Sequence, residues 1–163
     1  MRSVVMIYPD KCTGCRICEM ACSLSHAKEC NPERSRIRVI TSEEQGMLTT
    51  VPMLCMQCEK AMCEVACPTK ATYRNALGVM AVDEKKCIGC SACVYACPFG
   101  ASALDPGTGK AIRCDQCEGD PRCVKFCPAQ ALEYVRLDKV SAARKRQGVE
   151  RLMELQKITY GVS

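Results

Sequence analysis

Sixteen of the chain's 17 cysteines fall into four sets of four, and this repeat constrains the fold more than any other feature of the sequence. The first and third sets have the spacing C-x2-C-x2-C-x3-C, whereas the middle gap widens to four residues in the second set and to five in the fourth. Proline follows the last cysteine of every set except the first. In chain order the sets are Cys12, Cys15, Cys18 and Cys22; Cys55, Cys58, Cys63 and Cys67; Cys87, Cys90, Cys93 and Cys97; and Cys114, Cys117, Cys123 and Cys127.

The spacing within a set suits an iron–sulfur cube. Two residues between cysteines let one tight loop bring three thiolates around a cluster, and Gly14 and Gly89 let the backbone pass close to inorganic sulfur. The fourth cysteine lies about one helical turn beyond the third and projects away from that loop. In two-cluster ferredoxins this fourth residue ligates the other cluster and a proline follows it. The spacing therefore predicts sets that exchange ligands in pairs, with four [4Fe–4S] clusters in all.

Two other uses of the cysteines remain as alternatives. Structural zinc takes four ligands, commonly from two short C-x2-C pairs or from mixtures of cysteine and histidine, and a triple-plus-one pattern does not resemble that arrangement. A closed set of disulfides would leave one of 17 thiols over. Iron–sulfur ranks ahead of zinc, and zinc ahead of disulfides.

The rest of the composition predicts a cytoplasmic chain without a membrane span. The apolar run near the N-terminus is too short for a signal-peptide core, and no stretch approaches the roughly 18 apolar residues that a span needs. The formal charge of +5 at first suggests nucleic acid. Sixteen ligating thiolates and four oxidised cores would bring that charge to about −3, so no nucleic-acid partner is expected.

Short strands and helices alternate with the cysteine loops, which predicts an α+β fold made of two pseudo-symmetric bacterial-ferredoxin-like units in one body. The second and third sets form one unit over residues 55–99, and the first and fourth sets form the other over residues 1–30 and 100–136. A β-hairpin insertion fills residues 31–54, and a helical docking tail follows over residues 137–163. The expected strands are Val4–Ile7, Arg36–Ile40, Leu48–Val51, Val79–Val82 and Leu132–Val135, with a helix over Cys18–Ser25 and a turn over Asp105–Gly109.

Over roughly residues 4–136 the sequence resembles the four-cluster iron–sulfur electron-transfer subunits of molybdenum and tungsten pterin enzymes, and of some hydrogenases and formate dehydrogenases. The four cysteine sets carry this resemblance, together with C-I-G-C-S-A-C-V-Y-A-C-P-F-G-A over Cys87–Ala101 and R-C-D-Q-C-E-G-D-P-R-C-V-K-F-C-P over Arg113–Pro128. The small size and the basic tail are most similar to the iron–sulfur subunits of tungsten-dependent aldehyde oxidoreductases.

The resemblance implies a ligand set for each cluster, because in this family the first set pairs with the fourth and the second with the third. It also implies that the clusters form a linear path for electrons. The implied ligand sets are Cys12, Cys15, Cys18 and Cys127; Cys22, Cys114, Cys117 and Cys123; Cys55, Cys58, Cys63 and Cys97; and Cys67, Cys87, Cys90 and Cys93.

The role of a few residues outside the four sets stays open at this point. Lys11, Lys86 and Arg113 each precede the first cysteine of a set, where a cation would raise the potential of an anionic cluster or would simply be a solvated surface charge. Cys30 belongs to no set and is expected to be a free thiol. His26 is expected to be a surface or packing residue, or a contact for a partner.

No catalytic motif accompanies the clusters, so the sequence predicts a non-catalytic electron-transfer subunit of an anaerobic oxidoreductase complex. The expected partner is a large catalytic tungsten or molybdenum pterin subunit, with a flavin subunit or a soluble ferredoxin as the other redox partner, and self-association is a further possibility. The alternatives are a free soluble polyferredoxin and a subunit of a hydrogenase or formate dehydrogenase.

Overall fold

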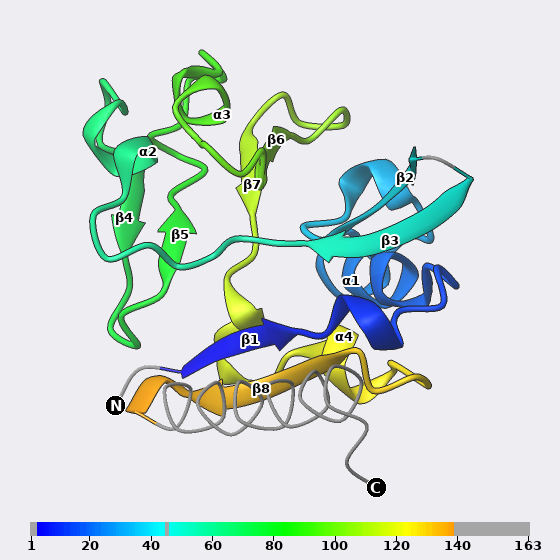
Figure 1. Ribbon diagram of the computed structural model, residues 1–163. Coiled ribbons are helices and arrows are strands. Elements are labelled where there is room, and N and C mark those ends of the chain that lie inside the picture. The colour runs from blue at the N-terminus through cyan, green and yellow to red at the C-terminus, as the bar shows by residue number, and fades with distance from the viewer. Residues whose placement is uncertain (1–2, 45, 139–163) are drawn as a thin grey trace, which may run out of the picture.

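Four antiparallel strand pairs, with short helices packed beside them, make up this mixed α/β structure (Figure 1). The computed structural model describes residues 3–44 and 46–138. The strands are β1 (Ser3–Ile7), β2 (Arg38–Glu44), β3 (Met47–Met53), β4 (Thr72–Arg74), β5 (Met80–Val82), β6 (Ser102–Leu104), β7 (Ala111–Arg113) and β8 (Leu132–Arg136). The helices are α1 (Ile17–Ala27), α2 (Met62–Val65), α3 (Ala92–Tyr95) and α4 (Arg122–Lys125), with 3-10 turns η1 (Pro9–Lys11), η2 (Pro32–Arg34) and η3 (Gln116–Gly119).

The two ends of the described chain come together in one strand pair. β1 runs antiparallel to β8, with Val5 opposite Tyr134. Val5 and Leu132 lie in a core that also takes in Ile37 and Leu54, and α1 and α4 pack side by side against it (Figure 1). The first and fourth cysteine sets are thereby folded into one half of the molecule.

The expected hairpin between the first and second cysteine sets is present, and each of its two strands is longer than expected. β2 pairs with β3, with Ile40 opposite Val51. Val39 faces inward and is buried, whereas Ile40 on the other face is half exposed, as alternation along a strand requires. The hairpin therefore covers the first half of the molecule with one face only.

The other half contains β4–β5, β6–β7, α2 and α3 around a second core (Figure 1). The expected turn over Asp105–Gly109 joins β6 to β7, and Ala111 of this hairpin is buried in the second core with Met80. Residues 102–113 thus pack with the second and third cysteine sets. The expected boundary at residue 100 had placed this hairpin with the first and fourth sets. The chain crosses between the halves after β3 and again after β7 (Figure 1).

Helix length follows the presence or absence of proline after the fourth cysteine of a set. α2, α3 and α4 each have four residues and end just before a Cys-Pro pair. The first set has Ser23 in place of proline, and α1 continues for 11 residues, past the expected end at Ser25. Proline disfavours helical backbone in the residue before it, so its absence lets α1 continue.

The structure differs from the expectations, or does not reach them, at three points. The strands β4, β6 and β7 were not expected, because three residues are too few to show periodicity. The expected helical tail over residues 137–163 lies outside the described residues, apart from its first two. Within the described residues, no helix is long and apolar enough to cross a membrane.

Candidate iron–sulfur centres

The cysteine loops contain backbone that only a few residue types adopt easily. Gly14 and Gly89 have φ of +70° and +71°, in the left-handed region that favours glycine. At Gly89 a Cβ atom would lie 2.5 Å from the carbonyl oxygen of Gly109, so the loop of the third set also needs glycine for space. At Gly14 the nearest atom to an added Cβ is the Thr50 side-chain methyl carbon, at 3.4 Å. The expected close approach of both glycines to inorganic sulfur stays a prediction.

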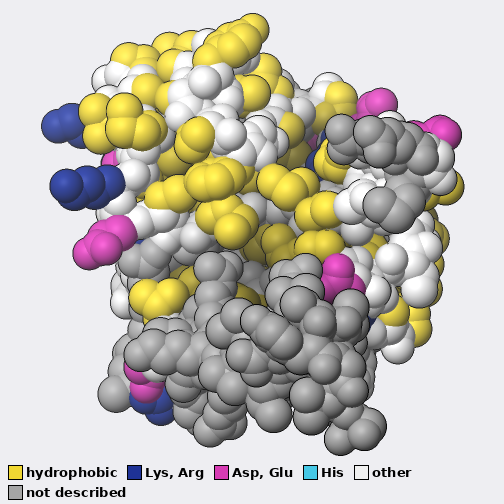
Figure 2. Space-filling view, in the orientation of Figure 1, with side chains coloured by type: hydrophobic (Ala, Val, Ile, Leu, Met, Phe, Trp, Pro, Cys, Tyr) yellow, Lys and Arg dark blue, Asp and Glu magenta, His cyan; other side chains and the backbone are white. Residues whose placement is uncertain are grey.

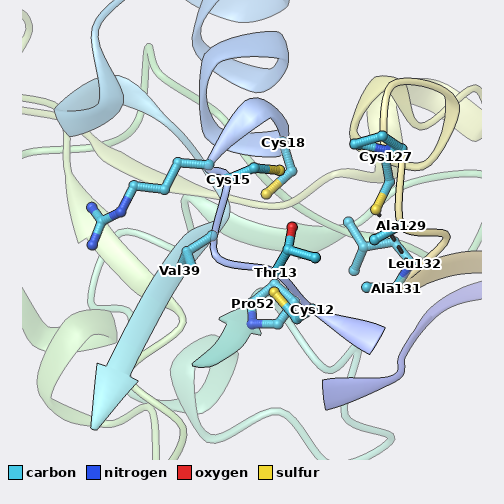
Figure 3. Close-up of a pocket in the computed structure, with 12 residues that line it drawn as sticks. Cys12, Thr13, Cys15, Cys18, Val39, Pro52, Cys127, Ala129, Ala131 and Leu132 are labelled. Atoms are coloured by element: carbon cyan, nitrogen blue, oxygen red, sulfur yellow. Dashed lines mark hydrogen bonds between the residues drawn. The ribbon is translucent and has the colours of Figure 1, made fainter. Parts of the chain in front are cut away.

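Cysteines from different sets meet around three pockets in the described structure. Each pocket is lined by three cysteines of one set and by the fourth cysteine of another. We name these sets of four after their first member: the Cys12 group (Cys12, Cys15, Cys18 and Cys127), the Cys55 group (Cys55, Cys58, Cys63 and Cys97) and the Cys67 group (Cys67, Cys87, Cys90 and Cys93). In the Cys12 group, Cys127 faces the other three from the loop after α4 (Figure 3).

The remaining four cysteines, which we call the Cys22 group, lie where α1 meets the segment after β7. Cys22, Cys114 and Cys123 are buried in the first core. Burial, together with the nearby sulfurs of Cys22 and Cys117, raises the pKa of Cys123 to about 12. The four thiols are therefore near enough to oppose one another's ionisation.

Buried thiols of this kind suit a cationic cofactor. Burial raises the pKa of Cys18 to about 12 and that of Cys114 well above its usual value. Such thiols keep their protons at neutral pH unless a cation replaces them, because metal binding releases the proton. An all-sulfur set of four is the usual coordination of a [4Fe–4S] cluster, so the residues fit that group.

Backbone N–H groups point at the last cysteine of each set. In the second, third and fourth sets the donor is the alanine four residues after the cysteine, within the repeated sequence Cys-Pro-x-x-Ala. These bonds run from Ala71 to Cys67 (3.2 Å), from Ala101 to Cys97 (3.4 Å) and from Ala131 to Cys127 (3.3 Å). The first set lacks the proline, and Arg36 donates its N–H to Cys22 instead, at 3.3 Å.

The hydrogen bonds change the acidity of at least one of these thiols. Burial alone would raise the pKa of Cys67, but N–H donors from Thr72 and Ala71 and the hydroxyl of Thr69 outweigh burial and lower that pKa to about 7. N–H donors stabilise a thiolate and also modulate the potential of a cluster bound through it.

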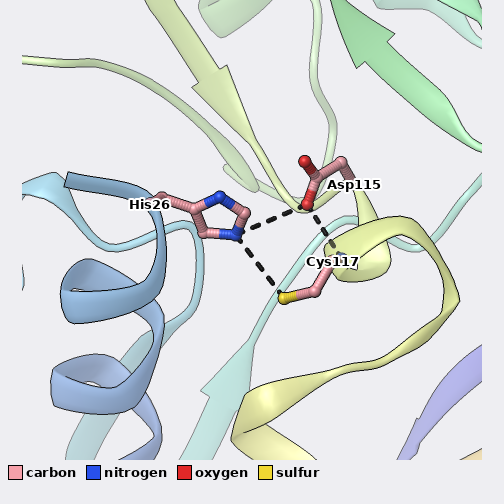
Figure 4. Close-up of side chains that lie close together, drawn as sticks. All are labelled: His26, Asp115 and Cys117. Carbon is pink, nitrogen blue, oxygen red and sulfur yellow. Dashed lines mark hydrogen bonds and ion pairs between the residues drawn. The ribbon is translucent and has the colours of Figure 1, made fainter. Parts of the chain in front are cut away.

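His26 contacts the Cys22 group, which the sequence did not indicate. Its Nε2 lies 3.5 Å from Cys117 Sγ and 3.5 Å from a carboxylate oxygen of Asp115 (Figure 4). His26 lies four residues after Cys22 in α1. No motif connects it to Cys117, so only the packing of α1 against η3 shows the contact.

Cys30 lies apart from all four groups. It is exposed, on the loop between α1 and η2. It is absent from the linings of the three pockets described above.

Comparisons with known proteins show which family this chain is similar to. The model of the 4Fe–4S dicluster domain family matches residues 46–137, and a 4Fe–4S binding domain matches residues 9–25. The chain is 45% identical over 124 residues to the "aliphatic sulfonate oxidoreductase, polyferredoxin-like subunit" of Pyrococcus furiosus, which is 76% of this chain and 70% of that protein. It is 36% identical to the thiosulfate reductase electron transfer subunit PhsB of Salmonella typhi, over 86% of this chain and 79% of the other.

Two further matches cover nearly the full length of both proteins. The electron transport protein HydN of Escherichia coli is 35% identical over 90% of this chain and 97% of its own. A chain of the active site complex BamBC of benzoyl coenzyme A reductase, in a structure with benzoyl-CoA, superposes with a TM-score of 0.50 and 27% identity over 93% of this chain and 89% of that one. This chain therefore belongs to the family of ferredoxin-like 4Fe–4S electron-transfer subunits of oxidoreductases, and its role is non-catalytic.

Proposed function

We propose that this protein carries electrons through four [4Fe–4S] clusters, one held by each of the four cysteine groups, to or from a catalytic subunit. One observation supports this proposal most strongly. In each of three pockets, three cysteines of one set meet the fourth cysteine of another set. The pairing is the one that ligand exchange between sets requires. Each bound cluster would supply a one-electron redox centre.

We propose that the cysteine groups form a linear path for electrons, in the order Cys12 group, Cys22 group, Cys55 group and Cys67 group. Cys18 of the Cys12 group is near enough to raise the pKa of Cys123 in the Cys22 group. Cys55 has the same effect on Cys114, which connects the Cys22 group to the Cys55 group. α2 and α3 pack together and bring the Cys55 group beside the Cys67 group.

The two outer groups of this order each contain an exposed cysteine, Cys15 in the Cys12 group and Cys90 in the Cys67 group. We propose that redox partners dock beside these two residues. On the face that carries α2 and α3, apolar side chains gather at the surface (Figure 2). Val65 is 78% exposed and Tyr95 is 87% exposed there, which suits burial against a protein partner near Cys90.

The same proposal divides the chain into two ferredoxin-like units. Residues 1–30 with 114–136 hold the Cys12 and Cys22 groups, and residues 55–113 hold the other two. The support is the pair of cores, one for each unit, and the β6–β7 hairpin in the second of them. The hairpin over 31–54 covers the first unit.

For the partner we propose a large tungsten or molybdenum pterin subunit of the aldehyde oxidoreductase type in the cytoplasm, with a flavin subunit or a soluble ferredoxin at the other end. The relatives named for sulfonate oxidoreductase and thiosulfate reductase support a catalytic partner of some kind. The similarity to HydN, named only as an electron transport protein, favours the alternative of a free carrier.

Anaerobic purification of the native protein, with mass spectrometry and metal analysis of what co-elutes, distinguishes a subunit bound to a pterin enzyme from a free carrier. The proposal predicts a large subunit in fixed ratio that contains tungsten or molybdenum. A monomer without a partner would support the free carrier, and a co-eluting subunit without either metal would exclude the pterin partner.

The basic tail provides a second test of the partner. Removal of residues 137–163 is expected to abolish co-purification while the four clusters are retained, because the tail follows the last strand that the core requires. A complex that survives the truncation would contradict a docking role for the tail.

A further inference from the structure

Arg113 is a buried cation that lies between two cysteine groups. It ends β7, and its strand partner across the hairpin is Ser102. Its Nη1 donates to Cys63 Sγ of the Cys55 group at 2.7 Å, and its Nη2 donates to Ser102 Oγ at 3.0 Å. The Ser102 hydroxyl in turn lies 3.9 Å from Cys93 Sγ of the Cys67 group. One guanidinium therefore contacts one group directly and the next through a hydroxyl.

No carboxylate compensates this charge within residues 3–44 and 46–138. Arg113 is 4% exposed, and its Nε is buried without a hydrogen-bond partner. An unpaired buried charge is costly, so a buried arginine needs anions around it. Burial would lower the pKa of Arg113, but the hydrogen bond to Cys63 and the nearby sulfurs of Cys93 and Cys55 outweigh burial and raise it. The anions that stabilise this cation are the cysteine groups.

The two lysines at the equivalent sequence position behave differently. Lys86 precedes the third set, but its side chain is 62% exposed and lies 3.5 Å from Asp83. Lys11 precedes the first set and is exposed, with its Nζ 5.0 Å from the centre of the Tyr8 ring. Both lysines lie on turns, whereas Arg113 belongs to a strand whose residues are all buried. Burial, and not the position before a cysteine, separates Arg113 from the lysines.

We propose that Arg113 is a counter-ion shared by the clusters of the Cys55 and Cys67 groups, and that it raises the reduction potentials of both. This inference rests on the proposed function, since it assumes a cluster in each group. A four-thiolate cluster is an anion that gains one more negative charge when reduced, and a fixed buried cation favours the reduced state. Arg113 acts through Cys63, and through Ser102 on Cys93, so the direct contact is expected to have the larger effect.

The test compares Arg113→Gln, Ser102→Ala and Lys86→Gln in the full-length, cluster-loaded protein, by redox titration followed with electron paramagnetic resonance. Cys58→Ser and Cys90→Ser variants assign the signals, since each changes one group. Arg113→Gln is expected to reduce the equilibrium constant for reduction of the Cys55-group cluster at least tenfold, which is 59 mV for one electron. Ser102→Ala is expected to lower only the Cys67-group potential, and Lys86→Gln to shift neither.

Unchanged potentials in an Arg113→Gln protein with full iron content would overturn the inference, and so would an equal shift in Lys86→Gln. If Arg113→Gln does not retain its clusters, Arg113→Lys decides the matter. A single ammonium keeps the charge near Cys63 but cannot also hold Ser102, so only the Cys67-group potential is expected to fall. Unchanged potentials in both Arg113→Lys and Ser102→Ala would then overturn it. Wild-type protein without iron–sulfur signals would instead contradict the proposed function.

Discussion

Gln57 donates from Nε2 to the backbone carbonyl of Cys114 at 2.9 Å, which joins the loop of the second cysteine set to that of the fourth. The other end of the same amide accepts the N–H of Met80 at 2.8 Å. Gln57 is 1% exposed, so both bonds are made away from water. This side chain connects the two halves of the molecule at the point where the Cys22 and Cys55 groups meet.

Gln57→Leu is expected to destabilise the protein, because it leaves the carbonyl of Cys114 and the N–H of Met80 buried without partners. Each such group costs about 1–3 kcal/mol. The midpoint of visible-absorbance loss during thermal or urea unfolding of the loaded protein measures the effect. Gln130→Leu is the matched control: Gln130 has nearly the same φ, +51° against +52°, but is exposed. Equal midpoints for the two variants would contradict the structural role of Gln57.

Gly89→Ala is expected to damage the Cys67 group, because its methyl group would lie 2.5 Å from the carbonyl oxygen of Gly109. Gly100→Ala is the control for backbone strain. Gly100 also has a positive φ, +60°, but nothing lies within 4 Å of the added carbon, so this variant introduces strain without the clash. Strain alone costs about 1–2 kcal/mol at either site. Iron content should therefore fall in Gly89→Ala and stay complete in Gly100→Ala. Full iron in both variants would show that the loop moves to accept the methyl group.

Cys30 is expected to be the thiol that reacts first in the loaded protein. It is exposed and outside the four groups, whereas ligation by iron would protect the others. Anaerobic alkylation followed by peptide mass spectrometry should give one modified residue per chain, and none in Cys30→Ser. Iron content should be the same in wild type and Cys30→Ser. Rapid alkylation of Cys15, which is also exposed, would argue that it is not a ligand.

Arg34 and Asp105 form a second connection between the halves, from η2 to the β6–β7 turn, with two nitrogen–oxygen distances of 2.8 Å. The hydrogen bond from Arg34 lowers the pKa of Asp105, against the effect of burial. A carboxyl group with a lowered folded-state pKa adds stability that is complete above its usual pKa and is lost as pH falls through the lower folded value.

Asp105→Asn is therefore expected to lower the unfolding midpoint by the same amount at pH 6 and at pH 8, since both lie far above the usual pKa of 3.8. The control is Asp120→Asn, because Asp120 makes its ion pairs with Lys125 and Arg122 at the surface, where such pairs contribute little. A loss that appears at only one of these pH values would contradict the assignment to the Asp105 carboxylate.

The sequence pattern was sufficient to predict the α+β character, the β2–β3 hairpin from the alternation of polar and apolar residues over Arg36–Ile40, and the strands β1 and β8. It did not reveal β4 and β6, although a signal was present: each begins five residues after the last cysteine of a set, as β8 does after Cys127. The repeated Cys-Pro-x-x-Ala sequence sets the turn, and the strand follows it. Periodicity cannot detect such strands, but alignment of the repeats against one another would have done so.

The sequence could not predict the contacts of Arg113 and His26 with the cysteines, for a different reason. Arg113, Lys86 and Lys11 each stand immediately before the first cysteine of a set. Only Arg113 lies in a paired strand, and the pairing of β7 with β6 buries its side chain. His26 meets Cys117 across 91 residues of chain through the packing of a helix against a loop. Tertiary position determines both contacts. His26 belongs to no motif, and the motif that begins at Arg113 does not show that its side chain is buried.

Anaerobic determination of iron and acid-labile sulfide in the full-length protein tests the central claim most directly. Four groups of four cysteines, each with a cube, predict about sixteen iron and about sixteen sulfide per chain. The count should fall when Cys58 or Cys90 is replaced by alanine, since each belongs to one group. A value nearer twelve iron in the wild-type protein, or stoichiometric zinc without sulfide, would contradict the account.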